Sequence, residues 1–341
     1  MRPLRVVDLN TWIGCVPRGF FGVTSLEPPG QKGRRFDALV AEVKAREVDV
    51  LLLQECLPMP SFAVQLARRL GYDVLWRVAN GGLRMGGWGL PTGIGRGEGL
   101  AILARPELRL TPIGERKLSG AGFVTNWCSF QLGPVRLAIA ARVQWGGRSV
   151  IVVSSHIRYG FPSREAFFAG WAALHARGVA RHPTPPAWLA RLTKGNDEAR
   201  DKELRRLARW LLKLRQGDHG APIILGADFN LDPEAPQVGD FVASTGYLNA
   251  LPDHWPGILT WDPLNNVHAA AASEVRWPDG RPKSAILQLM AYLDGIPQCP
   301  DHLLVSPGIE VAVTGRAFDA PVADILASDH YGIWADVTPL D

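Results

Sequence analysis

The feature of the sequence that most constrains its fold is a series of short apolar runs with the length and composition of β-strands. "LRVVDLN" (4–10) and "DVLLLQE" (49–55) are rich in leucine or β-branched residues. Between them, apolar residues recur at helical spacing from Phe36 to Val43. The chain therefore begins as strand, helix and strand, which is typical of an α/β protein.

Strand-like runs continue through the rest of the chain. Four of them follow one another between residues 99 and 155, with turn-like pairs between the last three, which indicates a β-meander rather than strict alternation with helices. These four are "GLAILA" (99–104), "FVTNWCSFQL" (123–132), "VRLAIAARV" (135–143) and "SVIVVSS" (149–155). Further strands are predicted at "PIILGA" (222–227), "HLLVS" (302–306), "IEVAVTG" (309–315) and "YGIWADV" (331–337).

The segments between the strands are of three kinds. Residues 60–70 have a helical pattern, whereas the glycine-rich stretch 79–99 is expected to be a loop, either a plain surface loop or one that closes over a substrate. Residues 157–196 show no periodicity. Residues 196–217 predict a helix capped by Asn196, with leucines on one side and basic residues on the rest. Such a helix packs on a core with a solvated basic face, or lies on a membrane or a phosphate backbone.

The composition is that of an ordinary globular protein. Hydrophobic residues make up 47% and charged residues 21% of the 341 residues, and we expect residues 1–341 to form one domain. The net charge of +4 suits an anionic substrate but is too small to establish a nucleic-acid or membrane surface.

Neither a disulfide framework nor a zinc motif is expected. The cysteines at 15, 56, 128 and 299 are far apart and form no C-x-x-C. A strand-like run begins already at residue 4, and no stretch is long and apolar enough to span a bilayer. We therefore expect a monomeric cytoplasmic protein, at most peripheral to a membrane.

Polar residues with chemical potential stand at the ends of the predicted strands. In a sheet-based fold such ends converge on one rim, so residues far apart in sequence can meet. The candidates are Asn10, Glu55, His156, Asp228, Asn230, Asp301, Asp329 and His330.

These residue types favour one kind of chemistry. Carboxylate and amide oxygens without a thiolate favour Mg²⁺, or Mn²⁺ as a substitute, over zinc. The two histidines add groups that titrate near neutral pH. A hard cation together with imidazoles is what phosphoester hydrolysis requires. Each residue alone is more often structural; the ordered set carries the prediction.

The order of these motifs resembles the endonuclease/exonuclease/phosphatase superfamily. The resemblance runs from residue 5 to 337 and rests on "DLNTW", "LLLQEC", "VVSSHI", "GADFN", "DHLLV" and the closing "SDH". It implies a four-layer α/β sandwich of two packed mixed β-sheets flanked by helices, and a Mg²⁺-dependent phosphodiesterase or phosphatase.

The resemblance also implies a role for each residue. Glu55 would be the principal metal ligand, with Asn10 and Asp329 beside it. Asp228 would orient or deprotonate the attacking water, and Asn230 would hold the phosphate. The remaining residues form two pairs: His330 as base with Asp301 as its partner, and His156 as acid with Glu98 as its partner.

Two departures from the usual motifs concern turns rather than catalytic atoms. Ser155 stands where the family has threonine before the histidine, and "GADFN" replaces "GDFN", which shifts the glycine by one position.

The substrate is less constrained than the reaction. "LNTWIG", the glycine-rich stretch before "EGLAIL" and "TWDPLNNVHAAA" (260–271) are most similar to the neutral sphingomyelinase branch, which cleaves a lipid phosphodiester. A nuclease is the alternative, with Arg158, Arg164 and the basic helix to bind phosphates. A phosphatase for a soluble ester and a non-catalytic binding module are two further alternatives. Tryptophans that could enter a bilayer interface from loops are Trp76, Trp88, Trp171 and Trp188.

Overall fold

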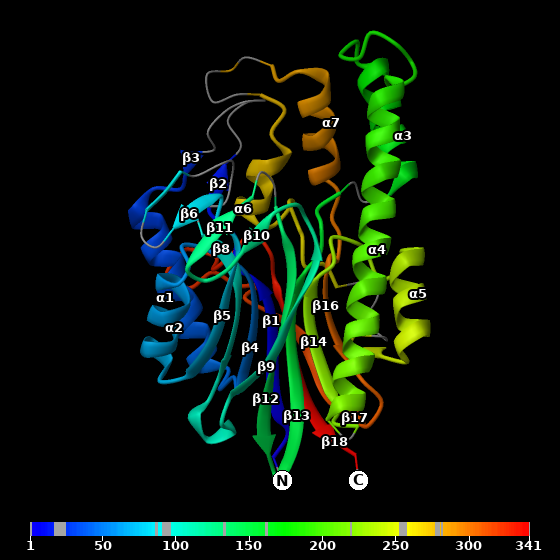
Figure 1. Cartoon of the computed structure of the whole chain (residues 1–341). Helices are drawn as coiled ribbons and strands as arrows, with labels where there is room; N and C mark the ends of the chain where they lie inside the picture. The colour runs from blue at the N-terminus through cyan, green and yellow to red at the C-terminus, as the bar shows by residue number, and fades with distance from the viewer. Residues whose placement is uncertain are drawn as a thin grey trace.

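Two six-stranded mixed sheets pack face to face in the computed structural model (Figure 1). The structure describes residues 2–16, 25–85, 88–90, 97–131, 134–160, 163–218, 220–251, 258–276, 280 and 282–340. The first sheet has the order β17 (Ile309–Ala317), β18 (Gly332–Pro339), β1 (Leu4–Asn10), β4 (Val50–Cys56), β8 (Glu98–Ala104) and β5 (Asp73–Asn80). The second has the order β15 (Leu248–Asn249), β16 (Asp301–Val305), β14 (Ile223–Asp228), β13 (Arg148–His156), β12 (Arg136–Trp145) and β9 (Thr111–Ser119).

Helices cover the outer face of each sheet, which confirms the predicted four-layer sandwich. The first sheet is covered by α1 (Pro29–Ala45) and α2 (Ser61–Leu70), and the second by α4 (Ala187–Gly217) and α5 (Pro236–Thr245). Alternate side chains of the central strands point inward between the sheets, where Val6, Leu52 and Ile224 are fully buried. This period of two is the pattern expected of strands in a packed sheet.

Smaller elements gather at one end of the sandwich (Figure 1). A separate apolar cluster joins α3 (Arg164–Ala176), the start of α4 and α7 (Ala285–Asp294). A four-stranded sheet has the order β10 (Phe123–Val124), β11 (Cys128–Phe130), β6 (Leu83–Met85) and β7 (Trp88–Leu90). The 3₁₀ turn η1 (Pro106–Leu108) follows β8 at the opposite end. The remaining short elements at the end with the four-stranded sheet are β2 (Cys15–Val16), β3 (Ser25–Leu26), α6 (Val267–Ala270) and the 3₁₀ turn η2 (Ala271–Ser273).

Strand direction explains why the candidate residues meet at this end. β1 runs parallel to β4, and β13 runs parallel to β14, so the last residues of these strands lie on one rim. β8, β16 and β18 are antiparallel to their neighbours and therefore begin where those strands end. The pairing of His156 with Asp228, and of Asp228 with Asp301, sets three candidates side by side. Both chain termini lie at the opposite end (Figure 1).

The prediction of a loop over 79–99 is wrong in part. Residues 83–85 and 88–90 form the hairpin of β6 and β7, and Glu98 already belongs to β8, whereas 86–87 and 91–96 lie outside the described residues. Strand β8 lies in the first sheet, so the meander is confirmed only for β12 and β13. The predicted strand 123–132 is two short strands joined by a turn, because Thr125 bonds back to Cys128.

The segment after His156 contains helices that the sequence did not reveal. α3 lies within the stretch without periodicity, and α4 begins at Ala187 rather than after Asn196, which is therefore inside the helix and not its cap. Helices α5 and α7 and strand β9 were also missed. β9 lies at a sheet edge and most of its side chains are exposed, which removes the alternation that marks a strand.

Of the three tryptophans whose side chains the structure describes, none lies in the predicted loop. Trp188 is exposed, but it lies on α4. Trp76 is half-buried in β5 and Trp171 is buried in α3, so both pack on apolar neighbours instead. The side chain of Trp88 lies outside the described residues. In the described ranges, none of the helices combines the length and apolar character of a bilayer span.

The two sheets approach each other closely at Gly226, the glycine of "GADFN". A Cβ on Gly226 would lie 2.4 Å from Asp8 Oδ1 and 2.8 Å from Leu52 Cβ in the opposite sheet. We expect Gly226→Ala to lower the free energy of unfolding by about 1–3 kcal/mol through overpacking. Gly239→Ala, at an exposed helical position with open space, should raise it by about 0.5–1 kcal/mol. Urea unfolding of both variants is the measurement, and an equal effect on both would contradict the interpretation.

Candidate active site

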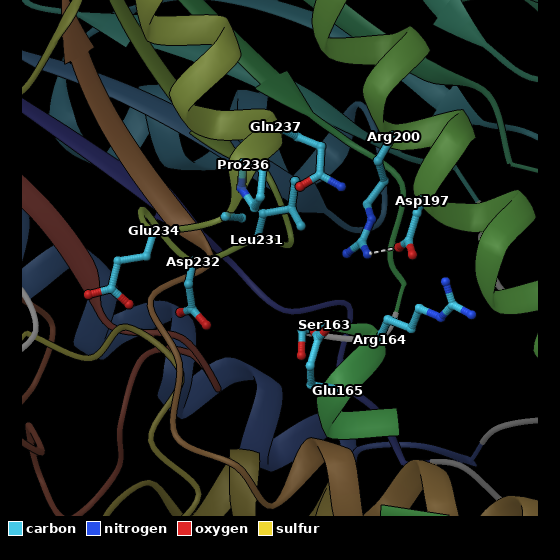
Figure 2. Close-up of a pocket in the computed structure, with 11 residues that line it drawn as sticks. Ser163, Arg164, Glu165, Asp197, Arg200, Leu231, Asp232, Glu234, Pro236 and Gln237 are labelled. Atoms are coloured by element: carbon cyan, nitrogen blue, oxygen red, sulfur yellow. Dashed lines mark hydrogen bonds and ion pairs between the residues drawn. The ribbon is translucent and has the colours of Figure 1, made fainter. Parts of the chain in front are cut away.

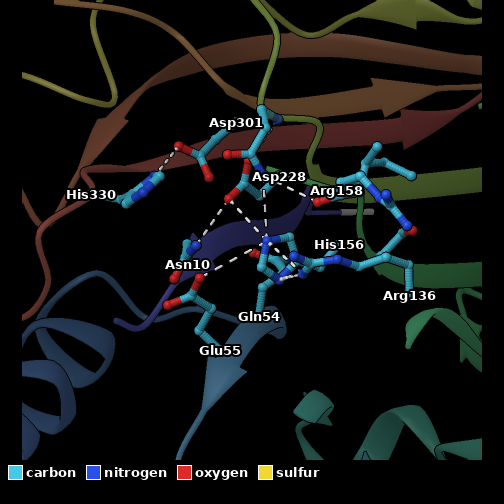
Figure 3. Close-up of polar contacts among 12 residues, drawn as sticks. Asn10, Gln54, Glu55, Arg136, His156, Arg158, Asp228, Asp301 and His330 are labelled. Carbon is cyan, nitrogen blue, oxygen red and sulfur yellow. Dashed lines mark hydrogen bonds and ion pairs between the residues drawn. The ribbon is translucent and has the colours of Figure 1, made fainter. Parts of the chain in front are cut away.

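A cavity of about 380 Å³ opens at the rim where the strand ends meet. It is lined by all of the sequence-predicted site residues except Asn10 and Asp301, which are buried directly beneath it. The side chains drawn in Figure 3 come from both sheets and point toward one another. The lining comprises Trp12, Ile13, Glu55, Asn80, Glu98, Pro134, Arg136, His156, Tyr159, Gly160, Asp228, Asn230, Trp261, Ala272, Met290, Asp294, Gln298, Pro300, Asp329 and His330.

His330 and Asp301 form a close pair on one side of the cavity. The distance from His330 Nδ1 to Asp301 Oδ2 is 2.7 Å, and both side chains are buried. Trp261 packs edge-on against the imidazole, with 5.1 Å between ring centroids. The carboxylate fixes the tautomer and the tryptophan fixes the tilt of the ring, so Nε2 is the nitrogen left to face the cavity.

Asp228 is held at the centre by three neighbours. The Asn10 amide donates to its Oδ2 at 2.9 Å, and the backbone N–H of Asn230 donates to its Oδ1 at 2.8 Å. His156 Nε2 lies 3.5 Å from the same Oδ2. Since Asn230 Nδ2 also donates to the carbonyl of Ile157, the loop after β14 is tied to the loop after β13. These contacts fix Asp228. Its Oδ2 contacts Asn10 of the first sheet and His156 of the second.

Glu55 and Glu98 lie near the two ring nitrogens of His156. Glu55 Oε1 is 3.9 Å from His156 Nε2, and Glu98 Oε1 is 3.8 Å from Nδ1. These separations are longer than a hydrogen bond, so neither carboxylate orients the imidazole directly. Asn80 instead donates to Glu98 at 2.6 Å. The Glu98–His156 pairing implied by the resemblance is therefore a proximity and not a bond in this structure.

Arg136 occupies the place next to His156 that Glu98 was expected to fill. Its Nη1 lies 3.3 Å from both ring nitrogens. Sequence reasoning missed this residue because a single arginine opening a strand carries no motif. Its position at the start of β12, on the same rim as the other strand ends, is the one signal that could have identified it. It brings a permanent positive charge into the cavity.

The backbone at the rim is bent at three of the residues that face the cavity. Trp12, Glu55 and Asn230 have positive φ angles of 58°, 53° and 53°. Such a conformation costs about 1–2 kcal/mol for a residue with a Cβ. Each of these residues stands at or just past the end of a strand. The bend turns its side chain from the sheet interior into the cavity.

Trp12 is held in place by a stack of charged and aromatic groups. The Arg35 guanidinium lies 4.6 Å from its ring centroid, and the ring of His268 lies 4.8 Å away. Arg35 forms a buried ion pair with Glu27 and donates to the carbonyl oxygens of Thr11 and Ala327. This network anchors one wall of the cavity, and no sequence motif predicted it.

A second arginine supports Asn230 from behind. Arg200, whose side chain is almost fully buried, donates to the carbonyl of Asn230 at 2.8 Å and pairs with Asp197 at 2.5 Å. Figure 2 shows it at the edge of a neighbouring cavity of about 410 Å³, between the start of α3 and the loop after β14. This lining mixes acids and bases, and it includes Arg164 from the sequence-based nuclease hypothesis.

The carboxyl groups of the site have raised pKa values. Burial, with the nearby charges of Glu98 and Asp329, raises the pKa of Glu55 to about 8. Burial and the charge of Asp301 raise the pKa of Asp228 to about 7. The pKa values of Glu98 and Asp329 are also raised by burial. So many acids cannot all ionise in this space without a balancing cation.

The two histidines are shifted in opposite directions. Burial lowers the pKa of His330, but the charges of Asp301, Asp329 and Asp228 outweigh burial and raise it well above the ordinary value. Burial and the charge of Arg136 hold the pKa of His156 well below the ordinary value. His330 is therefore the cation of the pair, and His156 is neutral.

The donor set suits a hard divalent cation. It offers carboxylate and amide oxygens and no thiolate. Among the described residues, ligand atoms of Asp228, Asp301 and His330 lie within 4.8 Å of one another. In that triad His330 Nδ1 is already bonded to Asp301, whereas the other oxygen of Asp301 is buried without a partner. Excess buried acid and an orphaned carboxylate oxygen are what a cation at this rim would relieve.

Comparison with protein families settles the class. The model described as the Endonuclease/Exonuclease/phosphatase family matches residues 18–330. The chain belongs to this family. It is accordingly a metal-dependent phosphoric ester hydrolase, which leaves the alternative of a non-catalytic binding module without support. A comparison with curated proteins found no match.

Solved structures of the family share its fold across nearly the whole chain. A D. rerio TDP2 structure complexed with single strand DNA product is 15% identical, covers 98% of each chain and has a TM-score of 0.57. The human Nocturnin catalytic domain with bound sulfate anion is 16% identical, covers 99% of this chain and 96% of its own, with a TM-score of 0.56. A Bacteroides thetaiotaomicron mannosyl-6-phosphatase is 16% identical, covers 98% and 99%, with a TM-score of 0.54. The sphingomyelinase-like branch is a finer assignment than these matches carry.

The raised carboxyl pKa values predict that the metal-free protein loses stability as pH rises from 6.5 to 8. Glu55 has a folded-state pKa of about 8 and Asp228 of about 7. In the unfolded chain both have a pKa of about 4. The folded state thus binds more protons in this window, so the free energy of unfolding falls by up to about 1.4 kcal/mol per pH unit for each extra proton.

Denaturant unfolding in the presence of a chelator is the measurement. Glu55→Gln removes one of the titrating groups and should make the fall with pH shallower. A free energy of unfolding that stays flat or rises over this window would contradict the assigned shifts.

Proposed function

We propose that this enzyme hydrolyses a phosphodiester with the help of Mg²⁺, for which Mn²⁺ can substitute. The observation that carries the proposal is the meeting of Glu55, Asp228 and His330 around one cavity, although they are separated by up to 275 residues of sequence. Glu55, with Asn10 and Asp329 beside it, would hold the cation. When bound, the ion would offset the negative charge of the phosphoryl oxygens and bring the substrate phosphate to the rim.

The residues around the cation would divide the remaining work. Asp228, fixed by Asn10 and the backbone of Asn230, would orient the attacking water and accept its proton. The Asn230 side chain would hold a phosphoryl oxygen. Arg136 is near enough to add a second positive charge on the side opposite His330.

The histidine roles follow from their charge. His330 is protonated through its pairing with Asp301, so it would bind a phosphoryl oxygen or donate a proton to the leaving oxygen. Neutral His156, whose Nε2 lies 3.5 Å from Asp228 Oδ2, would take over from Asp228 the proton of the attacking water. This favours the reverse of the assignment that the family resemblance suggested.

Hydrolysis of bis(p-nitrophenyl) phosphate tests the reaction. Activity should need Mg²⁺ or Mn²⁺ and disappear with a chelator. Glu55→Gln should weaken metal binding at least about tenfold. Asp301→Asn should lower kcat by about 10²-fold, by analogy with other lost orienting carboxylates, and should weaken metal binding less than Glu55→Gln does. Calorimetry of Mn²⁺ binding separates the two effects. Unchanged metal affinity in Glu55→Gln would contradict its role as ligand.

We propose a lipid phosphodiester, of the sphingomyelinase or phospholipase C type, as the substrate. The support is a set of exposed apolar side chains at the site end of the molecule, which we name the apolar collar. Phe123 and Phe130 pair across the small sheet and are 54% and 56% exposed. Their face continues to Met85, which is 66% exposed. The collar comprises Met85, Phe123, Trp127, Phe130, Leu264 and Val267.

The collar lies next to the cavity and not merely at the same end. The small sheet follows directly on Asn80, which bonds Glu98 in the cavity wall. Asn266, at the start of α6, donates to the backbone carbonyl of Asp329 at 3.0 Å. Exposed apolar patches of this kind mark interaction surfaces, and aromatic residues suit a bilayer interface. A lipid substrate fits a protein peripheral to a membrane.

A nucleic acid is the second candidate substrate. It is favoured by the basic face of α4, and the TDP2 relative is described with a single strand DNA product. A soluble phosphate ester, the kind of substrate that the name of the mannosyl-6-phosphatase relative indicates, is a third.

A hydrolysis panel with collar variants decides among these substrates. Sphingomyelin vesicles should be cleaved faster than oligonucleotides or sugar phosphates. The double variant F123S/F130S should lose about tenfold or more of the activity on vesicles and keep its activity on bis(p-nitrophenyl) phosphate. Leu340→Ser removes an equally exposed apolar side chain near the C-terminus and serves as the matched control. Preferred cleavage of oligonucleotides would replace the lipid proposal by the nuclease.

A further inference from the structure

A groove lined by basic residues lies on the side of the molecule, away from the apolar collar. The β9–α4 groove, of about 190 Å³, is lined by Arg116 of β9 and by four residues of α4, and this lining contains no carboxylate among the described residues. The α4 residues are Arg206, Arg209, Trp210 and Lys213. α4 runs along the second sheet (Figure 1), so a groove between α4 and β9 lies on the flank of the sandwich.

The basic residues of α4 form a line along the groove. Lys202, Arg206, Arg209 and Lys213 are spaced by four, three and four positions, which places them on one helical face. At about 1.5 Å per residue the line is about 16 Å long. Arg116 stands opposite this line on β9. A line of basic side chains with Arg116 facing it fits an extended polyanion better than a compact anion.

The charges of the groove are left unbalanced while others on the same helix are paired. Arg200 pairs with Asp197, and Arg205 pairs with Asp201. Within the described part of the chain, none of the groove cations forms an ion pair; Arg206 and Arg209 donate only to backbone carbonyls. Like charges three or four positions apart repel and destabilise a helix. The sequence thus compensates one side of α4 and leaves the groove side positive.

A chain of hydrogen bonds connects the groove with the loop after β13 at the rim of the catalytic cavity. Arg206 donates to the carbonyl of Leu118, and the next residue, Ser119, donates to the buried carboxylate of Glu203. Glu203 also accepts from the backbone N–H of Arg158, two residues beyond His156. A strand lying in the groove would therefore reach toward the cavity.

We propose that the β9–α4 groove binds the phosphate backbone of a single-stranded nucleic acid. The line of cations would neutralise successive phosphates, and half-buried Trp210 offers a surface for a base to stack on. A planar anionic bilayer fits less well, since the groove runs along the flank while the collar faces past the strand ends. The proposal does not depend on which phosphodiester the cavity hydrolyses.

Fluorescence anisotropy with a labelled twelve-nucleotide oligo-dT is the test, carried out with a chelator present so that no strand is cut. Binding should weaken with salt, with a slope of about −2 to −3 in log affinity against log salt. The double variant R209Q/K213Q should bind about tenfold or more weakly, with a slope flatter by about 1.4. Arg205→Gln, on the paired side of the same helix, should change the affinity less than about twofold.

Two results would overturn the proposal. One is an affinity of R209Q/K213Q equal to that of the wild type. The other is loss of binding to phosphatidylserine vesicles in this variant with oligonucleotide binding unchanged, which would assign the groove to a membrane. Hydrolysis of bis(p-nitrophenyl) phosphate by R209Q/K213Q should equal that of the wild type. That readout keeps a failure of the groove distinct from a failure of the proposed reaction.

Discussion

The structure depends on a cluster of carboxyl groups that the fold holds together against their own repulsion. Glu55, Glu98, Asp228 and Asp329 share one cavity, and among its described lining residues only Arg136 and protonated His330 carry a balancing positive charge. Burial raises the pKa values of all four acids, which is the free-energy cost of placing them there. A protein accepts such a cost where it serves function. A divalent cation would convert the repulsion into binding energy.

The two-sheet architecture allows the protein to hold these acids together. Each sheet contributes parallel strand ends and antiparallel strand beginnings to the same rim, so acids from distant parts of the chain meet without long loops. The tight approach at Gly226 keeps the sheets close, and the bent backbone at Glu55 and Asn230 aims their side chains into the cavity. The packing of the core between the sheets thus offsets the free-energy cost of the bent backbone and of the clustered acids at the rim.

The central strands, and the meeting of the candidate residues at one rim, were better predicted from the sequence than their surroundings. β1, β4, β14, β16 and β18 carry apolar runs because both faces of their sheets are covered, and the polar residue that ends such a run is easily recognised. β9 and α3 escaped prediction because an exposed edge strand and a helix packed on another helix pair lack that pattern. Arg136, Trp261 and the Trp12 stack were invisible for a different reason. Their importance arises from contacts between residues that are distant in sequence, which no local pattern encodes.

A crystal grown with Mn²⁺ would show directly whether the cluster of carboxyl groups binds a divalent cation, because anomalous scattering locates the ion independently of any assay. We predict one strong peak at the rim, about 2 Å from a carboxylate oxygen of Glu55 and close to Asn10 and Asp329. A protein saturated with Mn²⁺ whose peak lies elsewhere, with Glu55 turned away from the ion, would contradict this prediction.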